Sequence, residues 1–423
     1  MSTHMVAVLT WVCLAAVGEP TQLLRTEGRR LRVRPLELGA QVQPFTTPGA
    51  DTPIHLLISA FQDGQRCAKT LFRALRRAAH PQRLSFNVLQ AAGPEDVNCL
   101  KEFEINYLPR FCEGIVAASC PKEVLSRVHF WTIKLEEGKG PVHQRGLLSE
   151  RADLAGEGAM CLSMDSHMQF AQGWDHELLE DWASANNEFA VMTAYPMSAD
   201  DVADEGKKCW VSLCGYFLTE QGIPRGATGW PRYPKYERDN FATPRLTMNW
   251  AAGQSFSRCH AEKIVPADKN LLWMFNGEEV NRAVRLWTHG YDLYNPRVNV
   301  VLHNYSHASQ NFWSYSPPDL DLEKATSEER LKKLLQGDAG AETFGRYGLG
   351  NQRTVEQYVT HFHTDLGGKW TSYLRQKGIT PHFAGFVQHG AQQPGSVSGF
   401  CDDLQRLPVR NATELAAEAR APL

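Results

Sequence analysis

The sequence predicts an α/β fold with a mostly parallel sheet flanked by helices. The first observation is a buried-strand pattern at Ile54–Ala60, an amphipathic helix at Arg66–Ala79 and a second strand at Leu84–Leu89. A strand, a helix and a strand within about 35 residues form a βαβ unit, whose two strands run parallel. The second observation is Met160–Pro196, whose pattern is typical of a strand, an acidic turn, a helix and a strand. In both, polar residues follow a strand, which is where open α/β sheets bind nucleotides.

Further elements lie between these two units and after them. Val128–Leu135 has the pattern of a strand, and Gly140-Pro141 begins a helix that carries Arg145. The segment from 197 to 245 is irregular and rich in Gly, Pro and Tyr. We expect it to form loops over the site, with one strand at Trp210–Leu218.

The last part of the fold begins with a helix after Gly277 that ends at Gly290, as helices often end at glycine. Val298–His303 is the last expected strand, and the chain beyond it is mainly helical and charged. The expected organisation is a leader and linker at 1–50, an α/β domain at 51–316, a helical extension packed on it at 317–400 and a loosely ordered tail at 401–423.

The composition is that of a soluble globular protein. The chain has 423 residues, is 43% hydrophobic and 22% charged, and carries a formal net charge of −3. The low net charge and the lack of a basic block in the folded part argue against nucleic acid as a partner. The 11 tryptophans and 12 tyrosines suit stacking on a sugar or nucleotide, and they suit a large core equally well.

The N-terminus bears on location. Met5–Gly18 is an apolar run that is too short for a membrane span but fits the core of a signal peptide. Ala16-Val17-Gly18 resembles a cleavage site, so a signal peptide or anchor into the secretory pathway is favoured. The usual basic residues before the run are missing, which leaves a cytoplasmic location as the alternative. No other stretch approaches a transmembrane segment.

Ten cysteines are scattered along the chain without a CxxC pair, which excludes a zinc ribbon or a dithiol redox motif. Their number allows a few disulfides in an oxidising compartment. Cys112 with Cys120, or Cys209 with Cys214, are near enough in sequence to pair, and the pairing stays open.

Asp165-Ser166-His167 is a candidate metal site at the end of the strand that begins near Met160. Residues two apart in an extended chain point to the same side, so the carboxylate and the imidazole would face one ion. That pair of ligands suits a divalent ion such as manganese. The triplet alone is weak, because an aspartate that only caps the following turn has the same sequence.

The order of short motifs resembles a protist and algal family of N-acetylglucosaminyltransferases, which modify hydroxyproline on a cytosolic ubiquitin-ligase adaptor. A more distant likeness is to polypeptide N-acetylgalactosaminyltransferases, and both groups have the GT-A fold. The chain departs from the family in two places: Gln62 stands where the family has arginine, and the family's His-x-Tyr-x-Arg is here His303-Asn304-Tyr305-Ser306-His307. The matching pieces, spread over residues 52–366, are ISAFQDGQRCAKTL, GP with Arg145, GE at 156–157, MDSHMQFAQGWD, AAGQSFSR, NGEEVNRAVRLWTHGYD, HNYSH with Phe312-Trp313, and YGLGNQRTVEQY.

The resemblance implies roles for particular residues. It implies metal ligands at Asp165, His167 and His303, with His307 as a spare. It implies contacts to the nucleotide sugar from Asp63, Arg145, Asp165 and Gly253, and it gives Glu278 and Glu279 a catalytic role at the sugar or acceptor. Four of these residues have a purely structural alternative. Asp63 could be a turn residue, Arg145 a solvated helix residue, and the two glutamates first-turn acids that the helix dipole favours.

The resemblance also implies the reaction. We expect a retaining, metal-dependent transfer of GlcNAc from UDP-GlcNAc, with Mn²⁺ or Mg²⁺, to a protein hydroxyl of hydroxyproline or Ser/Thr. UDP-GalNAc is the alternative donor. A catalytically impaired GT-A domain that binds sugar nucleotide or glycan is the second reading, because of Gln62 and Ser306. A hydrolase built on His361 and His363 is the third.

Two sequons offer a check on location. Asn304-Tyr305-Ser306 abuts His303, so we expect it to stay unmodified. Asn411-Ala412-Thr413 is an acceptor for N-glycosylation if the chain is luminal.

Overall fold

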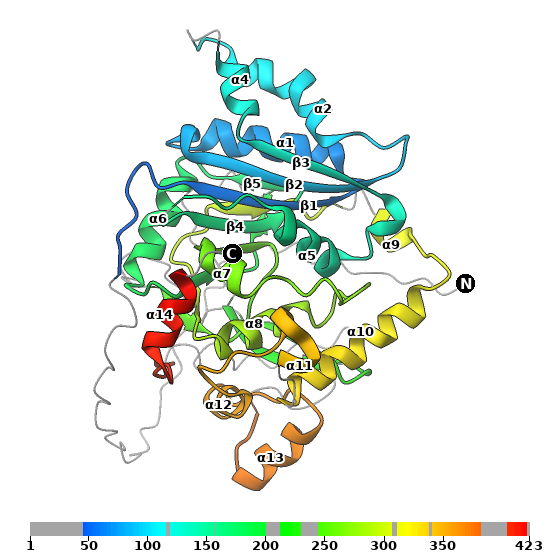
Figure 1. The fold of residues 1–423 in the computed structure, drawn as a ribbon, viewed down its shortest axis with the longest axis vertical. Coiled ribbons are helices and arrows are strands. Elements are labelled where there is room, and N and C mark those ends of the chain that lie inside the picture. Colours follow the sequence, from blue (N-terminus) through cyan, green and yellow to red (C-terminus); the bar gives the residue numbers. More distant parts are fainter. Residues whose placement is uncertain are drawn as a thin grey trace, which may run out of the picture.

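The structure is a computed structural model that describes residues 45–115, 119–156, 158–199, 212–229, 244–306, 311–337, 341–381 and 404–420. An eight-stranded sheet lies at its centre (Figure 1), and its strands have the order β10-β12-β6-β11-β4-β1-β2-β3. Its strands are β1 (Ile54–Phe61), β2 (Leu84–Ala92), β3 (Val128–Lys134), β4 (Met160–Asp165), β6 (Ala190–Thr193), β10 (Arg245–Thr247), β11 (Gln254–Arg258) and β12 (Asp292–Asn295).

Most neighbouring strands of this sheet run parallel. β1 pairs in parallel with β2 and β4, β2 with β3, and β12 with β6. β11 is antiparallel to β4 and β6, and β10 is antiparallel to β12. The mostly parallel α/β fold predicted from the sequence is confirmed.

Helices cover both faces of the sheet because its central strands are apolar on both sides. Leu56 of β1 packs in one hydrophobic cluster with α1 (Gly64–Arg77) and α6 (Trp174–Ser184). Leu57, the next residue, points to the other face and packs with Leu148 of α5 (Pro141–Arg151). Figure 1 shows α1 and α5 on opposite sides of the sheet. The same helices therefore hold the loops at the carboxyl ends of β1 and β4.

A second, three-stranded sheet has the order β5-β13-β7. The expected last strand, Val298–His303, is shorter in the structure, where β13 covers Val301–His303. β13 lies between β5 (Met168–Phe170) and β7 (Met197–Ser198) rather than in the central sheet. His303 is paired in register with Met168, so β13 brings the end of the fold back to the Asp165 turn.

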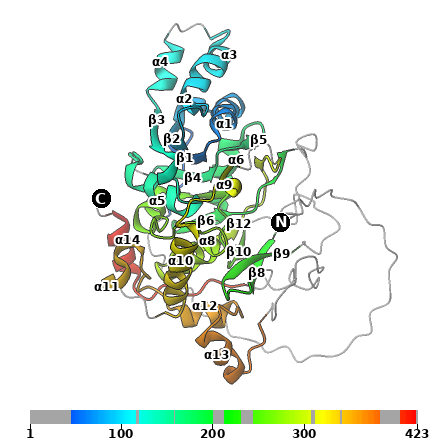
Figure 2. The same ribbon diagram turned by 90° about the vertical axis from the view of Figure 1, so that its right-hand side faces the viewer.

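A β-hairpin lies in the segment expected to be irregular. The strand expected at Trp210–Leu218 appears as β8 (Ser212–Leu218), and β9 (Pro224–Gly229) pairs with it. Trp210 lies outside the described residues. β9 contacts α8 (Glu278–Thr288), and Figure 2 shows the hairpin beside β10. The hairpin thus covers the beginning of α8.

The C-terminal helices share a core with the α/β domain. α10 (Leu320–Leu335), α12 (Val355–His361) and α13 (Lys369–Lys377) pack with α8 in one hydrophobic cluster. Because that core is shared, this part of the chain is not a separate unit. The remaining helices are α2 (Cys99–Glu102), α3 (Leu108–Cys112), α4 (Cys120–Leu125), α7 (Cys259–Ile264), α9 (Asn311–Ser314), α11 (Ala341–Phe344) and α14 (Ala412–Arg420).

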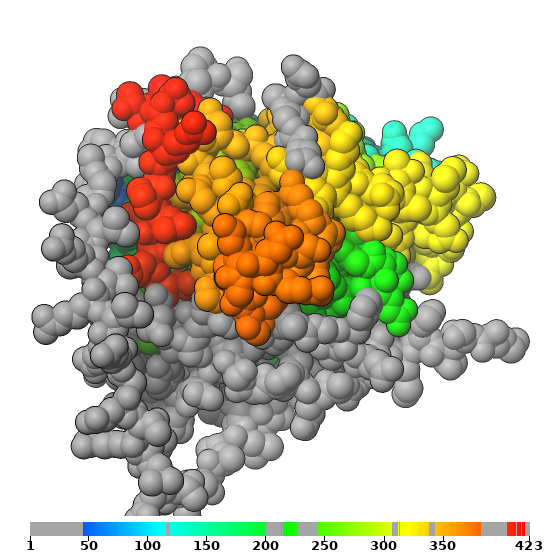
Figure 3. Space-filling view, turned by 90° about the horizontal axis from the view of Figure 1, so that it is seen from below, coloured from blue at the N-terminus to red at the C-terminus, as the bar shows by residue number. Residues whose placement is uncertain are grey.

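The end of the chain differs from the loosely ordered tail expected at 401–423. Residues 404–420 lie along the surface and end in helix α14, seen in red in Figure 3. Leu415 of α14 is completely buried, and Arg406 forms a 2.8 Å ion pair with Asp292. This order was not predictable from the local sequence, because the segment is short and its anchoring contacts are all distant in the chain.

Three disulfides tie these elements together: Cys67–Cys99, Cys112–Cys120 and Cys161–Cys259. Of the two pairings that the sequence left open, Cys112 with Cys120 is present, while Cys209 lies outside the described residues. Each bridge stabilises the fold by about 2–5 kcal/mol by restricting the unfolded chain. Within the described ranges, every helix is too short or too polar to cross a bilayer.

Candidate functional site

The carboxyl ends of β1 and β4 meet at one edge of the sheet. The two strands are parallel neighbours, with Ser59 paired in register with Asp165. β1 leads through α1 to β2 on one side, while β4 lies on its other side, so the strand order reverses between them. Open α/β sheets bind ligands at such a reversal. Asp63, just beyond β1, and Asp165, the last residue of β4, both lie at this edge.

Asp165, His167 and His303 form a group whose ligand atoms all lie within 4.8 Å of one another. We call these three residues the Asp165 cluster. Nε2 of His303 is 3.2 Å from Oδ2 of Asp165, and the two imidazole rings are 4.6 Å apart between centroids. The structure therefore brings together the three residues that the sequence predicted as metal ligands. The spare candidate, His307, lies outside the described residues.

Asp63 orients His167. Its Oδ2 lies 2.8 Å from Nδ1 of His167 and accepts a 2.7 Å hydrogen bond from the Ser166 hydroxyl. Its Oδ1 accepts a 2.6 Å hydrogen bond from Arg66. Burial acts to raise the pKa of Asp63, but the contacts with His167 and Arg66 outweigh it, and the pKa lies below its usual range. With Nδ1 held by Asp63, Nε2 is the nitrogen of His167 left to face a ligand.

Arg145 joins the two sides of the site. Its guanidinium donates to Oδ1 of Asp165 at 2.6 Å and to Oε1 of Glu278 at 2.5 Å, and the side chain is largely buried. Burial acts to raise the pKa of Asp165, but His303 and Arg145 hold it well below its usual range. Asp165 is therefore a carboxylate at any working pH.

Glu278 and Glu279 form the first turn of α8, after Gly277, and differ in their partners. Burial raises the pKa of Glu278 despite the opposing charge of Arg145. The hydroxyl of Tyr195 donates to Oε1 of Glu279. Burial raises the pKa of Glu279 to about 7, partly offset by that hydrogen bond. We call Glu279 and Tyr195 the Glu279 pair.

Gly253 lies between Pro196 and Asp165. A Cβ at this position would lie 2.9 Å from Cδ of Pro196 and 3.5 Å from Oδ2 of Asp165. A side chain there would have to displace the proline ring, so the close approach of the backbone to the Asp165 cluster requires glycine.

The sequence did not single out three of the residues at this site. Ser166 and Arg66 hold Asp63, and Tyr195 holds Glu279. The contact of Arg66 with Asp63 could have been predicted from the sequence, since Arg66 lies one helical turn after Asp63. Tyr195 follows β6 and meets Glu279 only through the fold, so no local pattern could reveal it.

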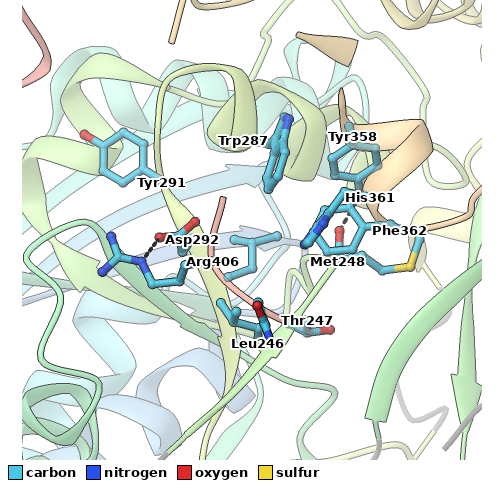
Figure 4. A pocket seen from close by; sticks show the side chains of 12 residues that line it. Leu246, Thr247, Met248, Trp287, Tyr291, Asp292, Tyr358, His361, Phe362 and Arg406 are labelled. Atoms are coloured by element: carbon cyan, nitrogen blue, oxygen red, sulfur yellow. Dashed lines mark hydrogen bonds and ion pairs between the residues drawn. The ribbon is translucent and has the colours of Figure 1, made fainter. Parts of the chain in front are cut away.

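A separate pocket lies at the edge of the sheet near β10 and β12 (Figure 4). Trp287, Tyr358 and His361 line it, and Arg406 closes one side through its ion pair with Asp292. None of the residues predicted for the transferase site lines this pocket. His361 stacks on Trp287 at 5.7 Å between ring centroids and is not part of the Asp165 cluster, which argues against the hydrolase reading.

Comparison with solved structures gives remote similarities. GalNAc-T7 with UDP, GalNAc and Mn²⁺ is 11% identical with a TM-score of 0.46, and the match covers 78% of this chain and 58% of that one. The chain thus spans less than two thirds of the GalNAc-T7 structure. The mannosyltransferase PcManGT from Pyrobaculum calidifontis, in complex with GDP-Man and Mn²⁺, is 9% identical with a TM-score of 0.37; the match covers 77% of this chain and 79% of that one.

Sequence comparison identifies the family. No curated protein sequence matches the chain. The family model for Glycosyltransferase (GlcNAc) matches residues 116–367, which is more than half of the 423 residues. The matched range includes the whole Asp165 cluster, together with Arg145 and the Glu279 pair. The membership that the order of motifs predicted is confirmed, and the chain belongs to the Glycosyltransferase (GlcNAc) family.

Proposed function

We propose that this glycosyltransferase moves GlcNAc from UDP-GlcNAc to a protein hydroxyl, of hydroxyproline or Ser/Thr, and depends on a divalent metal. The observation that carries the proposal is the Asp165 cluster, which gathers one carboxylate and two imidazoles at the sheet edge where nucleotides bind. UDP-GalNAc is the alternative donor.

The donor set fits a divalent ion. Two imidazole nitrogens beside one aspartate oxygen favour Mn²⁺ over Mg²⁺, because Mg²⁺ is bound mainly by oxygen ligands; Mg²⁺ is the alternative ion. The contact between Asp63 and Nδ1 of His167 is the outer partner that ligating histidines generally have. Asp165, His167 and His303 would hold the ion, which supplies Lewis-acid neutralisation of the charge that develops on the departing diphosphate.

Other residues bind and orient the substrates. Arg145, already placed beside Asp165, offers a guanidinium next to the diphosphate position. Gly253 leaves room for the donor sugar to approach the backbone. Glu278, on the other side of Arg145 from Asp165, and the adjacent Glu279 would contact the sugar and the acceptor hydroxyl. Asp63 acts on the nucleotide side, and its contact with His167 gives it an orienting role as well.

The transfer retains configuration at the anomeric carbon. The bond from that carbon to the UDP oxygen breaks, the bond to the acceptor oxygen forms on the same face, and the acceptor proton passes to the leaving phosphate. Retention is carried over from the resembled family. In this scheme no separate strong base is needed, and Glu279 serves to hold the acceptor hydroxyl.

The second candidate is a domain that binds sugar nucleotide or glycan without turnover. The observation that favours it is Gln62, which stands where the family has arginine and donates its amide to Asp96 at 3.0 Å. That side chain is occupied by a contact within the protein instead of presenting a positive charge to the diphosphate.

One experiment separates the two candidates. The purified chain is incubated with Mn²⁺ and either UDP-GlcNAc or UDP-GalNAc, and UDP release is followed with and without a hydroxyproline or serine peptide. We expect peptide-stimulated release from UDP-GlcNAc that is lost in Asp165→Asn. The matched control is Glu329→Gln, whose carboxylate is largely exposed on α10. UDP binding without release supports the second candidate, and release that persists in Asp165→Asn contradicts the metal site.

A further inference from the structure

Every cysteine whose side chain the structure describes is part of a disulfide. Cys67 and Cys99 are completely buried and join α1 to α2, and Cys161 and Cys259 join β4 to α7 across 98 residues. The third bridge, Cys112–Cys120, joins α3 to the beginning of α4. Disulfides of this kind form and persist in oxidising compartments and are rare in the cytosol. Each forms as two thiols pass two electrons and two protons to the thiol oxidant of such a compartment.

A second, independent feature is the sequon at Asn411, at the start of α14. Oδ1 of Asn411 accepts a 3.1 Å hydrogen bond from the backbone N–H of Glu414, which caps the helix. The backbone N–H of Asn411 donates to Gln352 at 3.0 Å. Nδ2 of Asn411 has no protein partner among the described residues, and Thr413 is exposed. The fold therefore uses the oxygen of the side-chain amide and leaves its nitrogen to solvent.

N-glycosylation modifies that nitrogen and no other atom of the cap. The donor is an oligosaccharide linked to a lipid diphosphate: the bond from its first sugar to the diphosphate breaks, the bond to Nδ2 forms, and the amide proton leaves with the diphosphate. Oδ1 remains a hydrogen-bond acceptor for Glu414 throughout. A glycan on Asn411 is thus compatible with α14 as it stands.

The other sequon, at Asn304, is held in the wall of the metal site. Asn304 follows His303 directly, and its Oδ1 accepts from the N–H of Ser306 at 3.0 Å. Tyr305 follows Asn304, and the centroid of its ring lies 4.1 Å from that of His303. The Tyr305 hydroxyl donates a 2.7 Å hydrogen bond to the carbonyl of Pro196. A glycan here would crowd the Asp165 cluster.

We propose that this chain matures in an oxidising compartment of the secretory pathway and carries an N-linked glycan on Asn411. Figure 1 shows α14 on the opposite side of the molecule from α9, the helix that follows His303, so the glycan leaves the site open. One consequence rests on the proposed function: the acceptor is then a protein of the same compartment, in contrast to the cytosolic adaptor of the resembled family.

The test expresses the full chain, with no added leader, in a eukaryotic cell. The protein is treated with peptide N-glycosidase in ¹⁸O water, and position 411 is read by peptide mass spectrometry. Thiols are alkylated before and after reduction. We expect ¹⁸O incorporation at position 411 and none at 304, with the six bridged cysteines protected until reduction.

Two variants keep the result specific to Asn411. Asn411→Asp retains the capping oxygen but has no amide nitrogen, so it should lose the glycan and keep the disulfides and the fold. Thr413→Ser should keep the glycan.

Three results overturn the proposal. Free thiols at the six bridged positions exclude the compartment. An unmodified Asn411 in a disulfide-bonded protein excludes a glycan at this position. A glycan on Asn304 contradicts the inference that only Asn411 is modified. None of these readouts uses transferase activity, so a failure here is separate from a failure of the proposed function.

Discussion

The Asp165 cluster and the Glu279 pair place two acids in one site, yet the fold drives their pKa values in opposite directions. Asp165 faces His303 and Arg145, and these partners hold its pKa well below the usual range. Glu279 faces the neutral hydroxyl of Tyr195 and the neighbouring Glu278, and burial raises its pKa to about 7. The difference lies in the charge of the partners, since burial acts to raise both pKa values. Permanent charge therefore suits the cluster, while the pair can hold a proton near neutral pH.

Arg145 is the point at which the two regions meet. It donates to Asp165 on one side and to Glu278, the neighbour of Glu279, on the other. Because it is buried between two carboxylates, its removal would leave negative charge without a partner.

Arg145→Met should have the largest effect. We expect the free energy of unfolding to fall by about 3–5 kcal/mol, as when one partner of a buried ion pair is removed. Urea unfolding measures it, with Lys101→Met, at an exposed lysine, as the control. The double variant Arg145→Met/Glu278→Gln should recover part of the loss, because it removes one of the stranded charges. A double variant as unstable as the single one would show that the charge balance does not explain the effect.

Glu279→Gln should change how the stability of the protein depends on pH. In the unfolded chain this carboxyl ionises near its ordinary pKa of 4.5, whereas in the folded chain it keeps its proton up to about pH 7. Between these values the folded state binds one more proton, so the free energy of unfolding falls by about 1.4 kcal/mol per pH unit as the pH rises. Above about pH 7 this contribution is constant.

Urea midpoints between about pH 4 and pH 8 should therefore decline less steeply in Glu279→Gln than in the wild type. The difference between the two proteins isolates Glu279 from other buried acids such as Asp181, whose pKa burial raises to about 6. Parallel pH profiles would contradict the assignment.

Asp63→Asn tests whether Asp63 aids metal binding at the Asp165 cluster by orienting His167. We expect Mn²⁺ affinity to fall by about 10- to 100-fold, because the carboxylate that orients His167 is lost. Isothermal titration with Mn²⁺ in the presence of UDP measures it, and activity should return at high metal concentration. Asp51→Asn, at an exposed turn, is the control. Unchanged affinity would mean that Asp63 does not act through His167.

Tyr195→Phe should have the smallest effect. It removes one hydrogen bond to Glu279 and leaves the ring in place, so we expect a loss of about 0.5–1.5 kcal/mol in stability. The same substitution should raise the pKa of Glu279 further, because the hydrogen bond lowers it. A downward shift of the pH transition in this variant would show that the hydroxyl does not favour the carboxylate.

The fold and two ligands of the cluster, Asp165 and His167, were readable from the sequence because local patterns encode them. The strand pattern before Asp165 and the two-residue spacing to His167 specify their shared direction. His303 was predictable only through the resemblance. β13 reaches the cluster by pairing with β5, and no local sequence pattern predicts that pairing. The contacts of Tyr195 with Glu279 and of Arg145 with Glu278 span 84 and 133 residues, so only the fold reveals them.

The same reason explains the misread end of the chain. Residues 404–420 have little periodicity of their own, and their order comes from the ion pair of Arg406 with Asp292 and the burial of Leu415. The disulfides were undecided for a related reason: two of the three join elements that are 32 and 98 residues apart.

The most direct test of the account is crystallographic. Crystals grown with UDP and Mn²⁺ should give an anomalous difference peak within ligand distance of Asp165, His167 and His303, in contact with the diphosphate. Bound UDP with no metal peak among these three side chains, or with the peak elsewhere, would contradict the metal site on which the proposed reaction rests.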